Sequence, residues 1–569
     1  MGASASTPAG PFSLRRELLG ALPIIEHFLV RLGIDDLLAT YVVSTDRRVR
    51  LAPAKVLGVL VRNLCVRHQP VYALGEWAAS YDPALLGLSA SEVSMLNDDR
   101  AGRALASLFD ADRASMLNRL VLDAVAGFGI DCQTLHNDST SVRLSGAYRN
   151  AVGALRGGKP TVAPARGFSK DHRPDLLQLV WILTVTAEGA VPIAHRIAPG
   201  NVEDSTTHIC TWDGLCQLLG RCDFLYCADC KLATKENMDH IDRGGGRFVT
   251  VLPQSRKEDV AFRTWLVTHE ATWTEAMRRP GRRLGDPEDV YETTEAPWPS
   301  AEGYRVVWVR SSAKIERDAE SRRRRIAEGI AALDELNQRL ASAKTRMKTV
   351  LAVETAAREA LERATAQRWV TFRVEETTEV RHRQESRGRP GANTRYRRLT
   401  RIRHQVRFSV ADDVVAADAR SDGCWPLITN DRALDGAELL IVYKHQPSLE
   451  RRHHILKGDQ LVAPVFLHDP ARIEGLMACH FVALLVGALV ELVVRRAMAD
   501  RGITELPLYP EDRACPAPSA ERIFEVFAGC SRQHLLDAHG ELIQTFSPEL
   551  NSLQRQLLNL LGVPAARYR

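Results

Sequence analysis

The first part of the chain has the apolar spacing of helices. Between residues 14 and 127, segments such as PIIEHFLVRLGIDDLLATYV and APAKVLGVLVRNLCV place apolar residues three and four positions apart. Tyr81, Asp82 and Pro83 form a turn signal within this region. The pattern predicts an all-helical N-terminal domain over residues 1–128. Helix pairs joined by short turns suit both a plain bundle and the recognition of DNA ends, so both interpretations stay open.

From residue 129 the spacing changes to that of strands. Three strand-like segments come first: IDCQTLHNDST, DLLQLVWILTVTAEG and AVPIAHRIAPGN. A helix over about 205–219, a strand DFLYCADC, a helix over about 235–242 and a strand RFVTVLP follow. This order of elements predicts the first part of an RNase H-like α/β layer over residues 129–253.

A charge-rich segment interrupts that layer between residues 254 and 421. It contains strand-like sequences (YRVVWVRS, RWVTFRVEE, HQVRFSVAD) and one expected helix of about fifty residues, 314–366. Apolar residues recur at heptad spacing from Ile326 to Val350, which favours packing within the same domain over a dimer zipper. We interpret the segment as an inserted α+β domain.

Core-like sequence returns over residues 422–569. A strand GCWPLITND and the segment LLIVYKHQPSLERRHHILKGD lead into LMACHFVALLVGALVELVV, whose length is close to the roughly 20 residues that span a bilayer. His480, Glu491 and the start at Asp469-Pro470 favour instead a helix buried in a large core. We therefore expect the second part of the RNase H-like core here, then a helical C-terminal region, and no membrane partner.

Composition narrows the class of protein only a little. The chain has 45% hydrophobic and 25% charged residues, which excludes a disordered protein, and its net charge of +5 does not by itself indicate nucleic acid. Eleven cysteines without framework spacing, and no secretory signal, predict reduced thiols in a cytoplasm. Cys227 and Cys230 have zinc-ligand spacing, but no second such pair exists.

Basic residues are clustered in the inserted segment. Arg322 to Arg325 form a continuous run, and ten arginines lie between Arg381 and Arg407 around a Gly-Pro sequence. Such runs are usually solvated surface, but two in one domain favour contacts with DNA phosphates. Lys170 and Arg173, before the second strand of the core, are further candidates for DNA binding.

Three carboxylates stand out as candidate metal ligands. Asp138 and Asp229 follow apolar strands of one predicted sheet, at the edge where sites form in open α/β folds. Glu450 lies in YKHQPSLERRHHILK, where Tyr443, Gln446, Glu450, His453 or His454, and Lys457 recur on one helix face. A few carboxylates and substrate phosphates suffice to bind Mg²⁺, and two such ions about 4 Å apart support in-line phosphoryl transfer.

Together these motifs resemble the DDE transposases of bacterial insertion sequences, over most of the chain. Tyr443, Glu450 and Lys457 match the family's Y-x2-R-x3-E-x6-K motif, and DST and ADCKLATKEN resemble its other two catalytic blocks. GFSKDHRPDLLQL and APGNVEDSTT resemble segments that flank the second and third strands in one branch of the insertion-sequence-four superfamily.

The resemblance implies roles for individual residues. Asp138, Asp229 and Glu450 would bind two Mg²⁺ ions, for which Mn²⁺ would substitute, and Tyr443 and Lys457 would hold phosphates near the scissile bond. Gln446 replaces the usual arginine, so a cationic contact is missing there unless a neighbour supplies it: Lys444, Arg451 or Arg452. Some relatives stack an aromatic side chain of the inserted domain on a flipped base, and the candidates by location are Trp308, Trp369 and Trp425, for which burial is the favoured interpretation.

The expected function is cut-and-paste transposition by Mg²⁺-dependent cleavage and strand transfer. The partners would be the terminal inverted repeats and the target DNA, bound by a homodimer in the cytoplasm at the nucleoid. An RNase H-fold nuclease or junction resolvase could use the same carboxylates but has less need of a large insertion. A catalytically silent DNA-binding derivative is the third possibility, and the intact set of Asp138, Asp229 and Glu450 argues against it.

Overall fold

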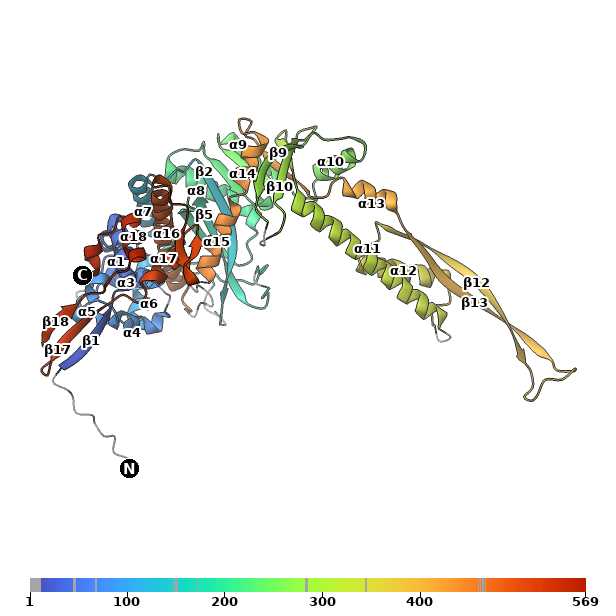
Figure 1. Cartoon of the computed structure of the whole chain (residues 1–569), viewed down its shortest axis with the longest axis horizontal. Coiled ribbons are helices and arrows are strands. Elements are labelled where there is room, and N and C mark those ends of the chain that lie inside the picture. The colour runs from blue at the N-terminus through green and yellow to red at the C-terminus, as the bar shows by residue number, and fades with distance from the viewer. Residues whose placement is uncertain are drawn as a thin grey trace, which may run out of the picture. The chain divides into compact units, whose positions relative to one another are not determined.

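The computed structural model describes residues 12–44, 48–66, 69–146, 148, 152–170, 172–281, 285–342, 345–458, 460, 462, 465 and 467–569. The chain is of mixed α/β class and divides into two units (Figure 1). The first unit combines Met1–Thr250 with Val442–Arg569, and the second is the continuous segment Val251–Ile441.

A mixed sheet lies at the centre of the first unit. Its strands run in the order β6-β5-β2-β7-β8, and their bounds are β2 (Thr134–Leu144), β5 (Leu177–Thr186), β6 (Pro192–Pro199), β7 (Leu225–Ala228) and β8 (Arg247–Val251). β5 is antiparallel to both β2 and β6, whereas β7 is parallel to β2 and to β8. α8 (His208–Leu219) and α9 (Lys235–Arg243) connect the later strands, so the predicted order of elements is confirmed.

Helices form the rest of the first unit's core. α16 (Pro470–Asp500) packs against α3 and α6, and 89% of its most apolar window is buried. Asp469 caps its first turn by accepting hydrogen bonds from the amides of Ala471 and Arg472. The predicted core helix is thus confirmed. The other N-terminal helices are α1 (Leu22–Arg31), α2 (Ile34–Tyr41), α3 (Pro53–Val66), α4 (Leu74–Ala79), α5 (Ala90–Val93), α6 (Asp98–Asp110) and α7 (Arg113–Phe128).

Strands at the two ends of the chain correct the expectation of helices alone. β1 (Phe12–Leu18) pairs antiparallel with β17 (Ser531–Asp537), which also pairs with β18 (Leu542–Phe546). Local spacing could not predict this sheet, because it joins segments far apart in the chain: Arg16 Nε donates to the hydroxyl oxygen of Ser531, 515 residues away. The remaining elements of the first unit are β3 (Leu155–Arg156), β4 (Lys159–Pro160), β15 (Leu506–Tyr509), β16 (Arg513–Cys515), α17 (Ala520–Phe527) and α18 (Ser552–Leu561).

The second unit contains an antiparallel sheet in the order β14-β11-β10-β9. The bounds are β9 (Thr274–Arg279), β10 (Asp289–Glu295), β11 (Arg305–Ser311) and β14 (Cys424–Thr429), with α10 (Lys257–Thr268) and α13 (Asp412–Ala419) beside them. Trp308 is 1% exposed and stacks on Phe262 with ring centroids 4.0 Å apart. Its expected burial is confirmed, and this indole has no free face for a base.

Two hairpins complete the second unit. The expected fifty-residue helix was wrong: the chain forms α11 (Ser312–Ala341) and α12 (Val350–Arg363), and Thr349 caps the second by accepting from the amide of Ala352. β12 (Val370–Gln384) and β13 (Tyr396–Val410) form a long antiparallel hairpin. Leu333, Leu336 and Leu340 of α11 pack in one hydrophobic cluster with residues of α12 and of this hairpin, which confirms that the apolar stripe packs within its own domain.

Candidate active site

Strand register brings Asp138 and Asp229 together. β2 and β7 pair in parallel from Thr134 opposite Leu225 to Asn137 opposite Ala228, and Asp138 and Asp229 are the next residues in the two segments. Asp229 directly follows β7, and its Oδ1 accepts a hydrogen bond from the amide of Lys231 at 3.0 Å. Asp138 was expected after a strand, but β2 continues to Leu144 because β5 still pairs with it. Asp138 therefore lies within β2 at the point where its neighbour β7 ends.

Burial and mutual repulsion disfavour the charged forms of both aspartates. Burial raises the pKa of Asp138 to about 6, the Lys170 ammonium lowers it, and the carboxylates of Asp229 and Asp204 raise it further. Burial also raises the pKa of Asp229, and Asp204 adds to that effect. A region in which several carboxylates resist ionisation has a strong attraction for a cation.

Lys170 provides a positive charge at this position. Its Nζ lies 3.5 Å from Asp138 Oδ1 and 3.9 Å from Asp204 Oδ2, and it donates hydrogen bonds to the carbonyl and hydroxyl oxygens of Ser139 at 2.5 and 3.2 Å. The sequence suggested Lys170 as a DNA contact, whereas here its ammonium group neutralises carboxylates. Arg173, the other residue suggested on this loop, is exposed and pairs with Asp175 at 2.7 Å.

Sequence reasoning missed Asp204 as part of this cluster. The residue begins a short 3₁₀ helix (Asp204–Thr206) after β6, and its Oδ1 accepts a hydrogen bond from Ser139 Oγ at 2.7 Å. The signal that could have found it is the acidic pair in APGNVEDSTT, directly after the third strand of the sheet. A fourth carboxylate therefore contributes to the negative charge around Asp138.

Helix α15 (Gln446–Lys457) packs on β2 and carries Glu450. Gln446 is 8% exposed, and its Nε2 donates to the carbonyl of Asn137 at 3.3 Å. His453 Nε2 lies 3.7 Å from Asp138 Oδ2. Glu450 is four residues after Gln446 and three before His453, so it shares a helix face with two side chains that reach β2 at positions 137 and 138. Its own side chain is exposed.

Tyr443 and Lys457 lie at either end of this helical region. Tyr443 is the last residue of α14 (Gly436–Tyr443), so the expected continuous helix from 443 to 457 does not form. The helix is interrupted because Pro447 has no amide hydrogen to donate to the Tyr443 carbonyl. Burial raises the pKa of the Tyr443 hydroxyl, and the charges of Asp229 and Glu450 add to this. Lys457 ends α15. Burial lowers the pKa of His453 to about 3, and the charges of Lys170 and Lys457 add to this.

The residues considered in place of the motif arginine have other partners. Besides its bond to Asn137, Gln446 has its Oε1 3.3 Å from His136 Nδ1, so its amide holds α15 on β2. Arg452 is 2% exposed and donates to the carbonyl oxygens of Gly189 and Ala190 at 2.7 and 2.9 Å. Arg451 is more exposed, and its Nη2 lies 4.0 Å from Glu491 Oε1. Of Arg451 and Arg452, Arg451 is the one that solvent or a phosphate could reach.

The oxygen ligands of this site fit a hard divalent cation. Asp138 and Asp229 supply neighbouring carboxylates, and Lys170 Nζ already holds a positive charge beside Asp138. Within the described residues, no group of three or more His, Cys, Asp or Glu side chains is already arranged to bind one metal ion. Binding that uses Glu450 as a third ligand therefore requires its exposed side chain to turn toward the two aspartates.

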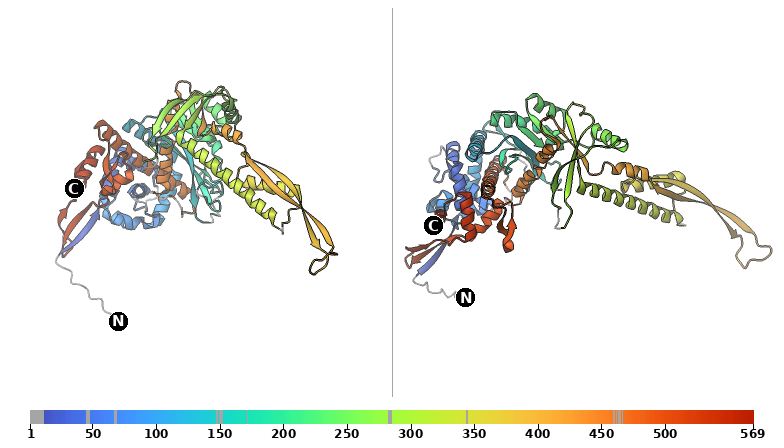
Figure 2. Two further views of the ribbon diagram at one scale, coloured as in Figure 1. Left: turned by 45° about the vertical axis from the view of Figure 1, so that its right-hand side comes forward. Right: turned by 45° about the horizontal axis from the view of Figure 1, so that its top comes forward.

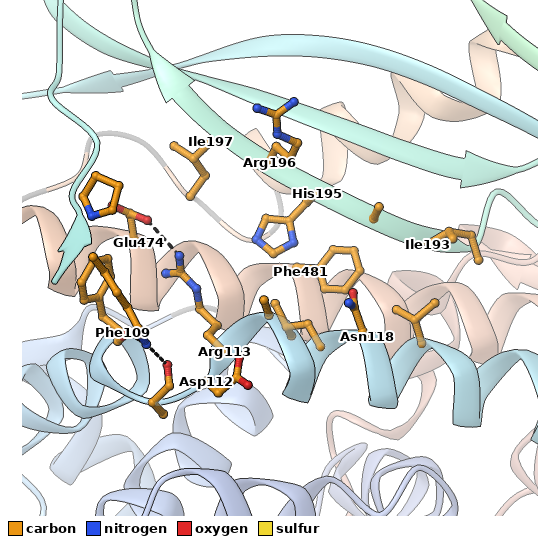
Figure 3. A pocket seen from close by; sticks show the side chains of 17 residues that line it. Phe109, Asp112, Arg113, Asn118, Ile193, His195, Arg196, Ile197, Glu474 and Phe481 are labelled. Atoms are coloured by element: carbon orange, nitrogen blue, oxygen red, sulfur yellow. Dashed lines mark hydrogen bonds and ion pairs between the residues drawn. The ribbon is translucent and has the colours of Figure 1, made fainter. Parts of the chain in front are cut away.

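The first unit also has a cavity of 380 Å³ lined by parts of α7, β6 and α16 (Figure 3). Arg113 pairs there with Glu474 at 2.9 Å. The His195 ring stacks between Trp181 and Phe481, with centroid distances of 4.9 and 4.5 Å, and burial lowers its pKa to about 3. None of the residues predicted for catalysis lines this cavity, and two of its charged side chains, Arg113 and Glu474, pair with each other (Figure 3).

We expect Asp138→Asn to stabilise the metal-free protein at neutral pH. Because the folded-state pKa of about 6 exceeds the ordinary 3.8, the stability contributed by this group is complete below pH 3.8 and is lost as the pH rises through 6. Asparagine removes that loss, which is about 3 kcal/mol at most at pH 8. Urea unfolding at pH 5 and pH 8 measures the effect, and an equal difference between variant and wild type at both values would contradict it.

Neither a scan against models of protein families nor a search of curated proteins finds a match for this chain.

Proposed function

We propose that the chain is the transposase of an insertion sequence, which cleaves and joins DNA by a DDE mechanism at Asp138, Asp229 and Glu450. The observation that carries the proposal is the register of β2 and β7, which makes the two aspartates neighbours while α15 packs on the same strand. The resemblance of the three sequence blocks that contain these carboxylates to the DDE family supports the same assignment.

The topology of the first unit supports an RNase H-like core. Among the five strands of this sheet, β2 comes first in the chain and lies at the centre. β5 and β6 lie on one side of it, each antiparallel to its neighbour. β7 and β8 lie on the other side and run parallel to β2. The chain leaves this unit after Thr250 and rejoins it at Val442, with α15 following directly. The large inserted domain thus comes before α15, the helix that carries Glu450. A transposase has more need of such an insertion than a simple nuclease has.

The chemistry would rest on positioning and charge. Mg²⁺ bound by the carboxylates would activate the attacking oxygen and stabilise the leaving one. Tyr443 and Lys457 lie on the same helical region as Glu450 and are suited to contact phosphate oxygens, one as a hydroxyl donor and one as a cation. Burial of Asp138 and Asp229 removes water from their surroundings and would thereby strengthen the attraction of their carboxylates for Mg²⁺.

A reaction with DNA that carries the flanking inverted repeats tests the proposal. The full chain is incubated with this DNA, a target plasmid and Mg²⁺ or Mn²⁺, and products are separated on a sequencing gel. Joined products are the expected result. Cleavage without joining would assign a nuclease or resolvase instead, and binding without cleavage would assign a silent derivative.

We further propose that two copies act together on DNA, because both ends of the element must be held for joining. Mass photometry of the chain with and without end DNA measures this. A complex of two chains and two DNA ends is expected, and a complex that stays at one chain per end under joining conditions would contradict it.

A further inference from the structure

The hairpin of β12 and β13 extends from the second unit as an arm. Its strands pair from Val370 opposite Val410 to Gln384 opposite Tyr396. The apolar residues near its base pack against α11 and α12. That support ends near Arg401, whose Nη2 donates to the carbonyl of Ser342, directly after α11, at 3.4 Å. Five further residue pairs and a loop project beyond the helices (Figures 1 and 2), which is about 16 Å of ribbon before the loop begins.

The projecting part of the arm has a positive charge that few acids offset. Seven arginines and one glutamate, Glu385, lie between Arg381 and Arg398. Nearer the base, the cations are paired: Arg403 and Arg381 contact Glu379 at 2.6 and 2.7 Å. Toward the tip, six arginines have no ion-pair partner among the described residues: Arg383, Arg387, Arg389, Arg395, Arg397 and Arg398. The charge at the end of the arm is thus available to an anionic partner.

The loop at the tip is narrow. It has the sequence Arg387-Gly388-Arg389-Pro390-Gly391, and it is closed by hydrogen bonds from the Glu385 amide to the Arg395 carbonyl at 3.0 Å and from the Gly391 amide to Thr394 Oγ1 at 2.7 Å. Gly388 has φ 141°, which favours glycine, and no atom lies within 4 Å of the position where a Cβ would be. Two exposed arginines therefore flank a backbone without bulky side chains.

We infer that this arm binds duplex DNA and inserts its Arg-Gly-Arg-Pro tip into the minor groove. A two-stranded ribbon can follow the DNA surface, and a slim tip is needed to enter a groove about 6 Å wide. Narrow minor grooves have an enhanced negative potential that attracts arginine, and proline is among the residues that DNA-bending proteins insert there. The inference deepens the proposed function, on which it rests for the choice of DNA as partner.

Arginine is suited to contacts with DNA. Every basic residue of the hairpin from Arg373 to Arg407 is arginine or histidine, as expected in a chain with 64 arginines and 11 lysines. The planar, weakly hydrated guanidinium suits phosphates and groove floors. Because attraction to an anionic membrane acts on either cation alike, the narrow tip and the proposed function, not the kind of cation, favour DNA over a lipid surface.

The test compares DNA binding by the full chain and by the double variant Arg387→Ala/Arg389→Ala. Fluorescence anisotropy with a labelled duplex, in EDTA so that no cleavage occurs, is recorded over a series of salt concentrations. We expect the variant to bind at least about tenfold more weakly, with the slope of log K against log salt reduced by about 2. The matched control is Arg278→Ala/Arg368→Ala in the same unit, which removes equal charge from side chains that are 55% and 65% exposed but paired with Glu275 and Asp418, and which should keep the wild-type affinity and salt slope.

Groove choice is tested with a small ligand that fills A·T-rich minor grooves. Such a ligand should displace the wild-type arm and remove most of the difference between wild type and the tip variant. Unchanged affinity and salt slope in the tip variant would overturn the inference, as would equal binding of double-stranded RNA, whose minor groove is wide and shallow. Binding to anionic vesicles but not to DNA would also overturn it. Strand joining by the tip variant at saturating protein reports on the proposed function separately, because the carboxylates are intact.

Discussion

Glu450→Gln is expected to reduce strand joining by about three orders of magnitude or more. The substitution keeps the size of the side chain but removes the charged oxygen that we propose as a metal ligand, and metal-based charge stabilisation supplies several kcal/mol to such a reaction. Asp138→Asn and Asp229→Asn should have effects of similar size, because each removes one of the two neighbouring carboxylates at the end of β7. Single-turnover joining of pre-cleaved end DNA in Mg²⁺ measures the loss without the cleavage step.

The Glu450 variant is well suited to this test because its side chain is exposed. Its free energy of unfolding should stay within about 0.5 kcal/mol of the wild-type value, so lost activity would not reflect lost structure. Glu521→Gln, an exposed glutamate on α17 of the same unit, is the matched control and should join at the wild-type rate. Joining by Glu450→Gln at the wild-type rate would remove Glu450 from the metal site.

The order of elements along this part of the chain could be predicted because its strands are rich in apolar residues. Most side chains of β5 are apolar, and nine of its ten positions are buried. The register between β2 and β7 was not predictable in this way, because it depends on hydrogen bonds between segments 91 residues apart, from Asn137 to Ala228. The sequence therefore identified Asp138 and Asp229 as candidates, and the register made them neighbours.

Residues that act through tertiary contacts were harder to assign. Lys170 belongs to a loop whose composition suggests DNA contacts, yet its Nζ lies 3.5 Å from Asp138 Oδ1. Asp204 has an ordinary position for an acid at the start of a short helix, and its tertiary contacts with Ser139 and Lys170 connect it to the site. Gln446 departs from the family motif, and its buried amide explains the departure structurally, because it holds α15 to Asn137 of β2.

Glu491→Leu is expected to destabilise the first unit by about 3–5 kcal/mol. Glu491 is 2% exposed and lies 2.9 Å from Arg452, whose side chain is 3% exposed. Burial raises the pKa of Glu491, but Arg452 and Arg495 outweigh it, so the carboxyl is held in its charged form. Removing it leaves Arg452 as a buried cation without its carboxylate, and an uncompensated buried charge costs far more than the pair itself contributes.

The same variant should also weaken the active site, because Arg452 lies two residues after Glu450 on α15. Urea unfolding measures the stability, and joining rates measured well below the unfolding midpoint measure the effect on α15. The control is Glu491→Leu/Arg452→Met, which replaces both charges by apolar side chains and should recover much of the lost stability. If Glu491→Leu alone unfolded at the wild-type urea concentration, the ion pair would not hold α15 on α16. If the double variant were no more stable than the single one, the loss would come instead from the bond that Glu491 Oε1 accepts from the Ala520 amide at 3.1 Å.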